Sequence, residues 1–247
     1  MAAMKHLFFV AILSLVCVNG INAQYNPKSK ANRFADFTAT VGNQEGAAAL
    51  SYVYNWRLGK NKKLEIGIGA RLTSYLGTKK DFITAPARLA RSTSVPFLVV
   101  FAAQEEQNFD TLVVQRPLTF SANATVNLGY NFNSRLYGGF NIDLVGFTVG
   151  RTTSGVFKSN GTTTTEPAAK PSAFNLLLTG DNDLGSLNSE FFLKYKISSR
   201  VALKAVYQFL FVEYKTTTLS QTAPDGTSVN RFRNKSNQFG LGVSYAL

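Results

Sequence analysis

Apolar and polar residues alternate along most of this chain, with the period of two that is typical of β-strands with one buried face. The longest run places eight apolar side chains in one register, with polar residues or glycine between them: Leu118, Phe120, Ala122, Ala124, Val126, Leu128, Tyr130 and Phe132. Seven other segments alternate in the same way. We therefore predict eight strands, over residues 34–42, 46–58, 63–76, 117–132, 135–150, 187–197, 200–215 and 232–247.

The connections between these strands are sorted by length. Short links at 59–62, 133–134 and 198–199 fall at the same end of the predicted sheet as both termini, and long loops over 77–116, 151–186 and 216–231 fall at the other end. Only the tight turn at 43–45 breaks the sorting. Bacterial outer-membrane barrels have this asymmetry and an even strand number, and a strand of roughly 9–11 residues suffices to cross the bilayer. The sequence thus predicts an all-β fold, a closed antiparallel up-and-down transmembrane β-barrel of eight strands.

Two features complicate the simplest version of this barrel. In the strand predicted at 135–150 the apolar parity changes between Leu144 and Val145, which predicts a β-bulge near Gly146. In the first long loop, Val95–Ala103 and Asp110–Val114 could form an extra hairpin with Gln104–Asn108 as its turn. We expect this hairpin to extend the barrel or cover its mouth, and ten crossing strands are the alternative.

The first residues have the organisation of a secretory leader. Lys5 precedes the apolar segment Leu7–Val18, which is too short to span a bilayer, and a small-residue site ends at Ala23. We predict cleavage after Ala23, so that residues 1–23 are a signal peptide and residues 24–247 are the barrel domain. Cleavage lowers the formal charge of +12 by one and removes the single His and the single Cys of the chain.

Charges of both signs lie on the polar stripe of the predicted strands. If the apolar stripe faces lipid, the polar stripe faces a lumen that eight strands make just wide enough for side chains to fill. Buried charges are costly unless they are paired. We therefore predict an interior polar network of Glu65, Arg71, Asp143, Glu190, Lys194 and Lys204. Lys196 lies on the same stripe, and we expect it, and to a lesser degree Lys204, near a solvated rim.

Aromatic residues gather at the short-link ends of the predicted strands, where an interfacial girdle would lie. They are Tyr54, Trp56, Tyr130, Phe132, Tyr195 and Tyr245. The last strand keeps apolar residues at alternate positions up to Leu247. With the leader, the eight alternating strands and the sorted loops, this chain resembles the small bacterial outer-membrane β-barrels of the OmpA/OmpX type over about Phe34–Leu247. The resemblance implies residence in the bacterial outer membrane, contact with its lipid and lipopolysaccharide, and insertion by the outer-membrane assembly machinery.

The long loops offer the remaining candidate chemistry. Loops 77–116 and 151–186 are exposed segments through which a surface ligand could bind, and the second is expected to be flexible. Asp181–Gly185 is faintly similar to a calcium loop, but Phe192 stands where a ligating glutamate is needed, so an Asx-turn is the preferred interpretation. Arg231, Arg233 and Lys235 form a basic patch that either meets lipopolysaccharide phosphates or is a solvated rim.

Several functions are disfavoured by what the predicted mature chain lacks. Without His or Cys it cannot perform His-dependent hydrolysis or acyl transfer, use a Cys nucleophile or form a His/Cys metal site, and we predict no enzyme and no cofactor. Its positive charges are scattered and the chain is exported, so nucleic acid is not an expected partner.

The first hypothesis is a non-enzymatic outer-membrane barrel with a filled interior, serving envelope structure or surface interaction. The alternatives are a small channel or hydrophobic-ligand uptake barrel, and a soluble lipocalin-like binder.

Overall fold

The structure is a computed structural model that describes residues 29–91, 93–95, 98–223 and 226–247. Its long strands are β1 (Ala31–Gly42), β2 (Glu45–Leu58), β3 (Leu64–Gly77), β6 (Leu118–Asn131), β7 (Leu136–Gly150), β11 (Leu187–Lys196), β12 (Val201–Lys215) and β15 (Arg231–Ala246). The short elements are β4 (Lys79–Thr84), α2 (Ala87–Ala90), α3 (Leu98–Phe101), η1 (Glu106–Asn108), β5 (Thr111–Gln115), β8 (Thr153–Ser159), β9 (Thr162–Pro171), β10 (Phe174–Leu176), η2 (Gly180–Asn182), β13 (Gln221–Thr222) and β14 (Ser228–Val229). The predicted signal peptide, residues 1–23, lies outside the described residues.

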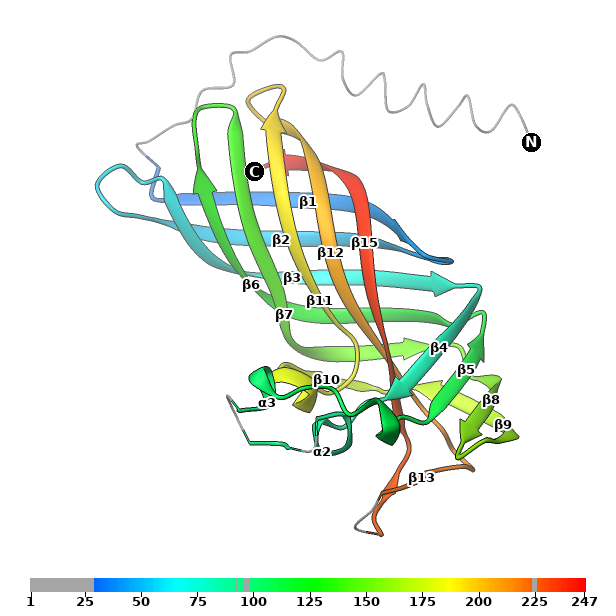
Figure 1. The fold of residues 1–247 in the computed structure, drawn as a ribbon. Coiled ribbons are helices and arrows are strands. Elements are labelled where there is room, and N and C mark those ends of the chain that lie inside the picture. The colour runs from blue at the N-terminus through cyan, green and yellow to red at the C-terminus, as the bar shows by residue number, and fades with distance from the viewer. Residues whose placement is uncertain (1–28, 92, 96–97, 224–225) are drawn as a thin grey trace, which may run out of the picture.

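The eight long strands pair in a closed antiparallel cycle. The order is β1, β2, β3, β6, β7, β11, β12 and β15, and β15 pairs back onto β1 from Phe34↔Ala246 to Val41↔Phe239. These strands match the eight predicted segments, but the described residues hold fifteen strands in all, so the predicted count was too low. The seven additional strands are short and gather at the end of the ring opposite the C-terminus (Figure 1). In the part of the chain that is described, no helix is both long enough and apolar enough to cross a bilayer.

A β-bulge interrupts the β6–β7 ladder where the apolar parity changes. Ala124 pairs with Val145 and Thr125 pairs with Asp143, so Leu144 is the extra residue. The bulge returns Asp143 to the inner face while Val145 and Phe147 point outward. The predicted irregularity is therefore confirmed, two residues before Gly146.

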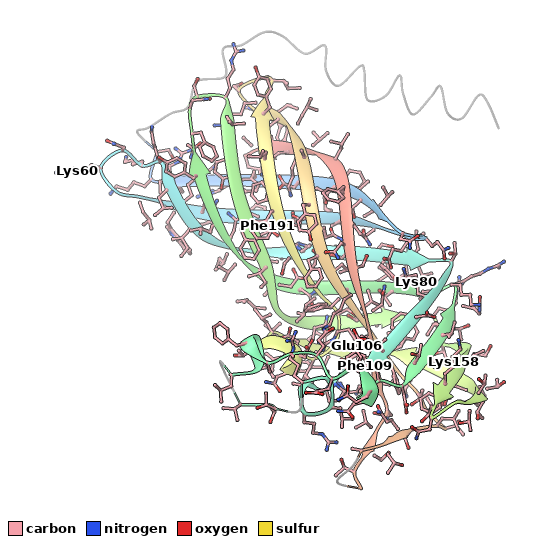
Figure 2. All side chains as sticks on the ribbon, viewed as in Figure 1. Lys60, Lys80, Glu106, Phe109, Lys158 and Phe191 are labelled. Carbon is pink, nitrogen blue, oxygen red and sulfur yellow. The ribbon has the colours of Figure 1, made fainter. Side chains whose placement is uncertain are left out.

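The ring is polar inside and apolar outside. Ile68 is 57% exposed on the outer face of β3, while Glu65 and Arg71, which have the opposite parity on the same strand, are buried at 0% and 1% exposure. The other long strands likewise turn most of their large apolar side chains outward, although Val53, Tyr137 and Phe192 are buried inside. Phe191 of β11 is one of the outward aromatic residues (Figure 2). A soluble lipocalin-like binder needs the opposite orientation, with apolar residues inside, so that alternative is wrong.

A second, smaller cycle of strands shares β12 and β15 with the ring. From β15 the pairing passes to β4, β5, β8 and β9 and then returns to β12. We call these four short strands, with the outer ends of β12 and β15, the head. Its interior is apolar: Phe82 lies against Tyr214 with ring centroids 5.1 Å apart, and Phe157 against Phe232 at 5.6 Å.

The head corrects several predictions about the loops. Val95–Ala103 does not form a strand in its described part, because Leu98–Phe101 is helical, and the strand β5 pairs with β4 instead. β5 belongs to the head and not to the ring, which has eight strands and not ten. The loop 151–186, expected to be flexible, contains the hairpin β8–β9, which turns at Asn160 and Gly161 with positive φ angles of 47° and 75°.

Candidate functional site

Three positive and three negative side chains form one chain of ion pairs across the lumen. Asp36 lies 2.9 Å from the Lys194 ammonium and 3.0 Å from that of Lys204. Lys204 also lies 3.0 Å from Glu190, whose carboxylate is 4.0 Å from Arg71. Arg71 ends the series at Asp143, 3.4 Å away, and all six side chains are at most 4% exposed. We call this set the lumen network; its formal charges sum to zero.

Strand register explains why Asp36 is needed in this network. Lys194 of β11 and Lys204 of β12 are directly opposite each other in the ladder, and like charges in that position repel. Asp36 of β1, two strands away from β12 around the ring, reaches across the lumen and contacts both ammonium groups. Its two oxygens therefore turn a repulsive pair into a bridged triplet.

Five of the six residues predicted for the interior lie in the lumen network, and Glu65 lies apart from it. Glu65 accepts hydrogen bonds from Arg57 Nε (3.0 Å), from Asn32 (2.8 Å) and from two further asparagine side chains, Asn55 and Asn131. It therefore has a separate, fully bonded site nearer the short-link end. Lys204, which was expected to a lesser degree near a solvated rim, is completely buried, whereas Lys196 is half-buried.

Sequence reasoning missed Asp36 and the asparagines that complete the lumen network. Asn123 donates to Asp143 at 2.6 Å, and Asn141 donates to Glu190 at 3.0 Å while its own side-chain oxygen accepts from Arg71. Asp36 could have been predicted from the sequence, because it shares the polar parity of Thr38 and Thr40 in the first strand. The asparagines share the polar parity of their strands too, but a neutral amide is not distinguished there from the other polar residues, whereas Asp36 adds a charge.

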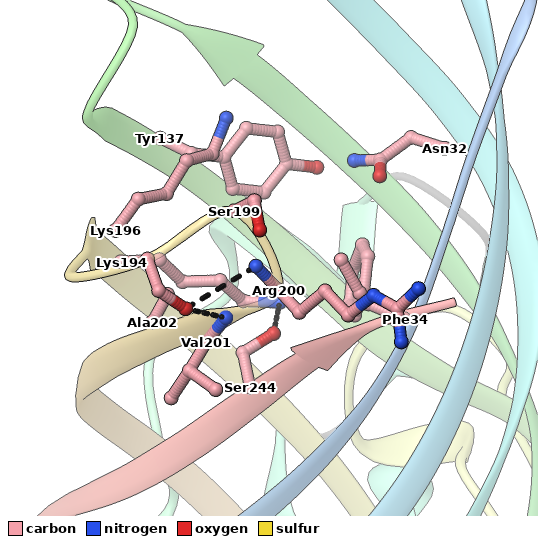
Figure 3. A pocket seen from close by; sticks show the side chains of 12 residues that line it. Asn32, Phe34, Tyr137, Lys194, Lys196, Ser199, Arg200, Val201, Ala202 and Ser244 are labelled. Carbon is pink, nitrogen blue, oxygen red and sulfur yellow. Dashed lines mark hydrogen bonds between the residues drawn. The ribbon is translucent and has the colours of Figure 1, made fainter. Parts of the chain in front are cut away.

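Below the lumen network, towards the short links, aromatic side chains fill the lumen. Tyr137, Phe192 and Val206 form a small buried cluster, and Phe34 meets Tyr137 edge-on. Two glycines on the neighbouring strands make room, because a Cβ at Gly129 would overlap the Tyr137 hydroxyl and one at Gly139 would press on the Phe192 ring. A cavity of about 50 Å³ remains at this end, between Asn32, Phe34, Tyr137, Lys194 and Ser244 (Figure 3).

The basic residues of the predicted patch are paired with acidic side chains. Lys235 lies 2.7 Å from Asp181, and Arg231 and Arg233 lie 2.7 and 3.2 Å from Glu213. Arg233 is 1% exposed. The patch is therefore not a simple solvated rim, because the loop segment 177–186 folds over these residues and supplies acidic and carbonyl partners. Binding of lipopolysaccharide by these residues stays a prediction.

The Asp181–Gly185 segment does not hold its carboxylates as a calcium loop would. Asp181 bonds to Lys235 and, at 2.5 Å, to Arg91, while Asp183 accepts a hydrogen bond from the Leu178 amide at 2.6 Å. Burial raises the pKa of Asp183 to about 6, whereas the hydrogen bonds from Lys235 and Arg91 outweigh burial and hold the pKa of Asp181 below its ordinary range. No group of three potential metal ligands is found among the described residues.

Asp183→Asn is expected to remove a pH dependence from the segment 177–186. A carboxyl whose pKa is raised by folding is favourable when protonated, so in the native protein the segment loses stability as the pH rises from about 4 to about 6. Asparagine keeps the acceptor oxygen without the charge. Hydrogen exchange at the Leu178 and Leu184 amides checks this: the variant should be better protected than the native protein above pH 6 and equal to it near pH 4. Equal protection at both pH values would contradict the prediction.

Comparison with known proteins gives a remote fold likeness and no family. No protein-family model matches the chain, and no curated protein matches it. Among solved structures, OprG of Pseudomonas aeruginosa aligns with 12% identity and a TM-score of 0.39, covering 89% of this chain and 97% of that one. Ail of Yersinia pestis aligns with 9% identity and a TM-score of 0.37, covering 88% and 99%, and Neisserial surface protein A with 10% identity and a TM-score of 0.33, covering 87% and 94%. At these TM-scores the likeness is too remote to transfer any role or residue to this chain.

Proposed function

We propose that this protein is an integral outer-membrane β-barrel whose lumen is closed by ion pairs and whose head lies outside the cell. The observation that carries the proposal is the polarity of the long strands: they expose Ile68, Leu193 and Leu241 and bury Arg71 and Glu190. Water would disfavour that outer surface, whereas acyl chains match it. The closed cycle of pairing supports the same conclusion, because a bilayer tolerates no unpaired strand edge.

The proposal includes the ends of the chain and its surroundings. Residues 1–23 are a leader cleaved after Ala23, and residues 24–247 are the barrel of the mature protein, inserted by the outer-membrane assembly machinery. The aromatic residues at the short-link ends support this placement, since Trp56, Tyr130 and Tyr195 are 41–48% exposed at one level of the ring. Lipid and lipopolysaccharide surround the ring.

The role we propose is non-enzymatic: envelope structure or surface interaction through the loops 77–116 and 151–186. The lumen network supports a structural interior, because its charges pair with one another and offer no uncompensated carboxylate to a substrate. The first long loop supports surface interaction. Around α3, which lies in the first loop, Leu98 and Phe101 are 62% and 86% exposed, an apolar surface that an extracellular ligand could cover.

Two measurements on the detergent-extracted mature protein test this function. A closed barrel should migrate faster on a gel before boiling than after, and in planar bilayers it should show no steady conductance, because the charges of the lumen network occupy the lumen. Solubility without detergent would overturn the membrane assignment. Steady conductance would replace the closed barrel by the alternative, a small channel or uptake barrel, while leaving the membrane assignment intact.

A further inference from the structure

An apolar groove crosses the outward face of the ring near its long-loop end. Its volume is about 450 Å³, and its floor is made of small residues, Ala48 of β2, Ser74 of β3 and Ala122 of β6. Large apolar side chains stand around this floor, among them Phe120 and Phe147. Ladder pairing holds the floor together, since Ala48 is opposite Ser74 and Ala122 is opposite Leu72. Small residues let an acyl chain approach the backbone closely, and the surrounding side chains add dispersion contacts.

A basic pocket lies directly above this groove, where β3 and β6 reach their long-loop ends, beside β4, β5 and the end of β7. Its lining includes the cations Lys79, Arg116 and Arg151. On β6 the surface passes from groove to pocket within two residues, from Phe120 to Leu118, and at the end of β7 it does so from Val149 to Arg151. Two residues of a strand cover about 6.6 Å and return to the same face. The apolar and basic surfaces are therefore continuous.

The backbone of the basic pocket is held in place from inside the molecule. Arg151 donates its amide to the Leu118 carbonyl at 2.8 Å, and Arg116 donates its amide to Thr78 at 2.6 Å while adopting a φ of 46°. The buried hydroxyl of Tyr214 accepts from the Leu118 amide and donates to the Arg151 carbonyl, both at 3.2 Å. The three cationic side chains are exposed, and within the described residues no ion pair includes any of them. This contrasts with Arg231, Arg233 and Lys235, which have acidic partners.

We propose that the groove and the basic pocket together bind one lipid of the outer leaflet, the phosphorylated and multiply acylated glycolipid lipid A. The inference rests on the proposed function, which places the long-loop end of the ring at the outer surface. Arg116 and Arg151 receive phosphate, for which the planar guanidinium is suited, and Lys79 adds a third positive charge. An acyl chain lies over Ala48, Ser74 and Ala122. Several cations above one groove fit a headgroup with more than one phosphate better than a singly charged phospholipid.

Lipid A titrated into the mature protein in detergent, with bound lipid counted by native mass spectrometry, tests the site. The double variant Arg116→Gln and Arg151→Gln should weaken binding by about tenfold for each cation removed. Ala122→Phe, which fills the groove and leaves every charge in place, should also weaken it. Lys158→Gln with Lys170→Gln is the matched control: it removes two exposed cations from the β8–β9 hairpin of the head and should leave binding unchanged. Lys158 lies in the head, away from the long strands (Figure 2).

The proposal is overturned if both double variants weaken binding equally, since the effect would then be one of total charge. It is also overturned if dephosphorylated lipid A or phosphatidylglycerol binds as tightly as lipid A, or if inorganic phosphate competes at the same concentration as the lipid. The gel shift on boiling reports whether the barrel has formed, so it shows whether a negative result concerns the lipid site or the proposed function. Variants that keep the shift but lose lipid A support the site, and a native protein that keeps the shift but never binds lipid A refutes the site alone.

Discussion

Replacing Glu190 by alanine is expected to lower the free energy of unfolding by about 3–5 kcal/mol, the usual cost of removing one partner from a buried ion pair. Glu190 lies 3.0 Å from Lys204 and 4.0 Å from Arg71, and it accepts a hydrogen bond from Asn141. Without it the lumen network has one positive charge in excess, in a place that water cannot easily reach. Urea unfolding in lipid vesicles, followed by the fluorescence of Trp56, the single tryptophan, measures the change.

Two further variants separate loss of charge balance from loss of packing. Leu193→Ala alters the same strand on its exposed outer side and should cost far less. The double variant Glu190→Met and Lys204→Met removes one charge of each sign and leaves the pairs Asp36–Lys194 and Arg71–Asp143 in place. It should therefore recover most of the stability lost in Glu190→Ala. If Glu190→Ala were no more costly than Leu193→Ala, the charges would be solvated and the filled lumen would be the wrong description.

Placing a charge on the outer face of the ring gives the second large expected effect. Ile68→Arg should destabilise the protein in vesicles by about 2–4 kcal/mol, the cost of a basic side chain near the midplane of the bilayer. Ile68 is 57% exposed in the isolated molecule, so in water the same change would cost little. Vesicle unfolding measurements therefore test whether lipid covers this face.

The matched control for Ile68→Arg is Thr163→Arg, on an exposed position of β9 in the head. There the arginine meets water, and the change in unfolding free energy should stay within about 0.5 kcal/mol. Equal effects of the two substitutions would mean that the outer face of the ring is not in contact with lipid. The proposed placement of the ring in a bilayer would then be wrong.

The eight long strands could be predicted because their signal is local. The period of two over Leu118–Phe132 indicates that successive side chains point to opposite faces of the sheet, one apolar and one polar. This pattern can be recognised without knowing the partner strand. The bulge at Leu144 was visible for the same reason, as a change of parity within a single strand. The head was not predicted, because β4 is short, and the strand at Thr111–Val114 was assigned to the wrong partner. Short apolar segments in loops do not specify what they pair with.

The polarity of the inward side chains changes along β12, and this change depends on the solvent that surrounds each part of the molecule. Its inward residues are Ala202, Lys204, Val206 and Gln208 within the ring and then Leu210, Val212 and Tyr214 towards the head. The parity is unbroken, yet the inner face passes from a mixture of apolar residues with Lys204 and Gln208 to a wholly apolar surface. This is expected if lipid surrounds the ring and water surrounds the head. Polar side chains are unfavourable against lipid and are buried inside the ring, whereas apolar side chains are unfavourable against water and are buried inside the head.

By itself, the sequence determined the number of long strands, which of their faces is apolar, and that charges of both signs occupy the other face, because these properties repeat along the chain at short range. Only the tertiary structure decided which charges meet. Asp36 and Lys194 are 158 residues apart and come together because strand order and register around the ring bring them to one level of the lumen. The same holds for the basic residues: Arg231, Arg233 and Lys235 are neutralised, while Arg116 and Arg151 are left exposed, because folding covers the first group with carboxylates and places the second at an open rim.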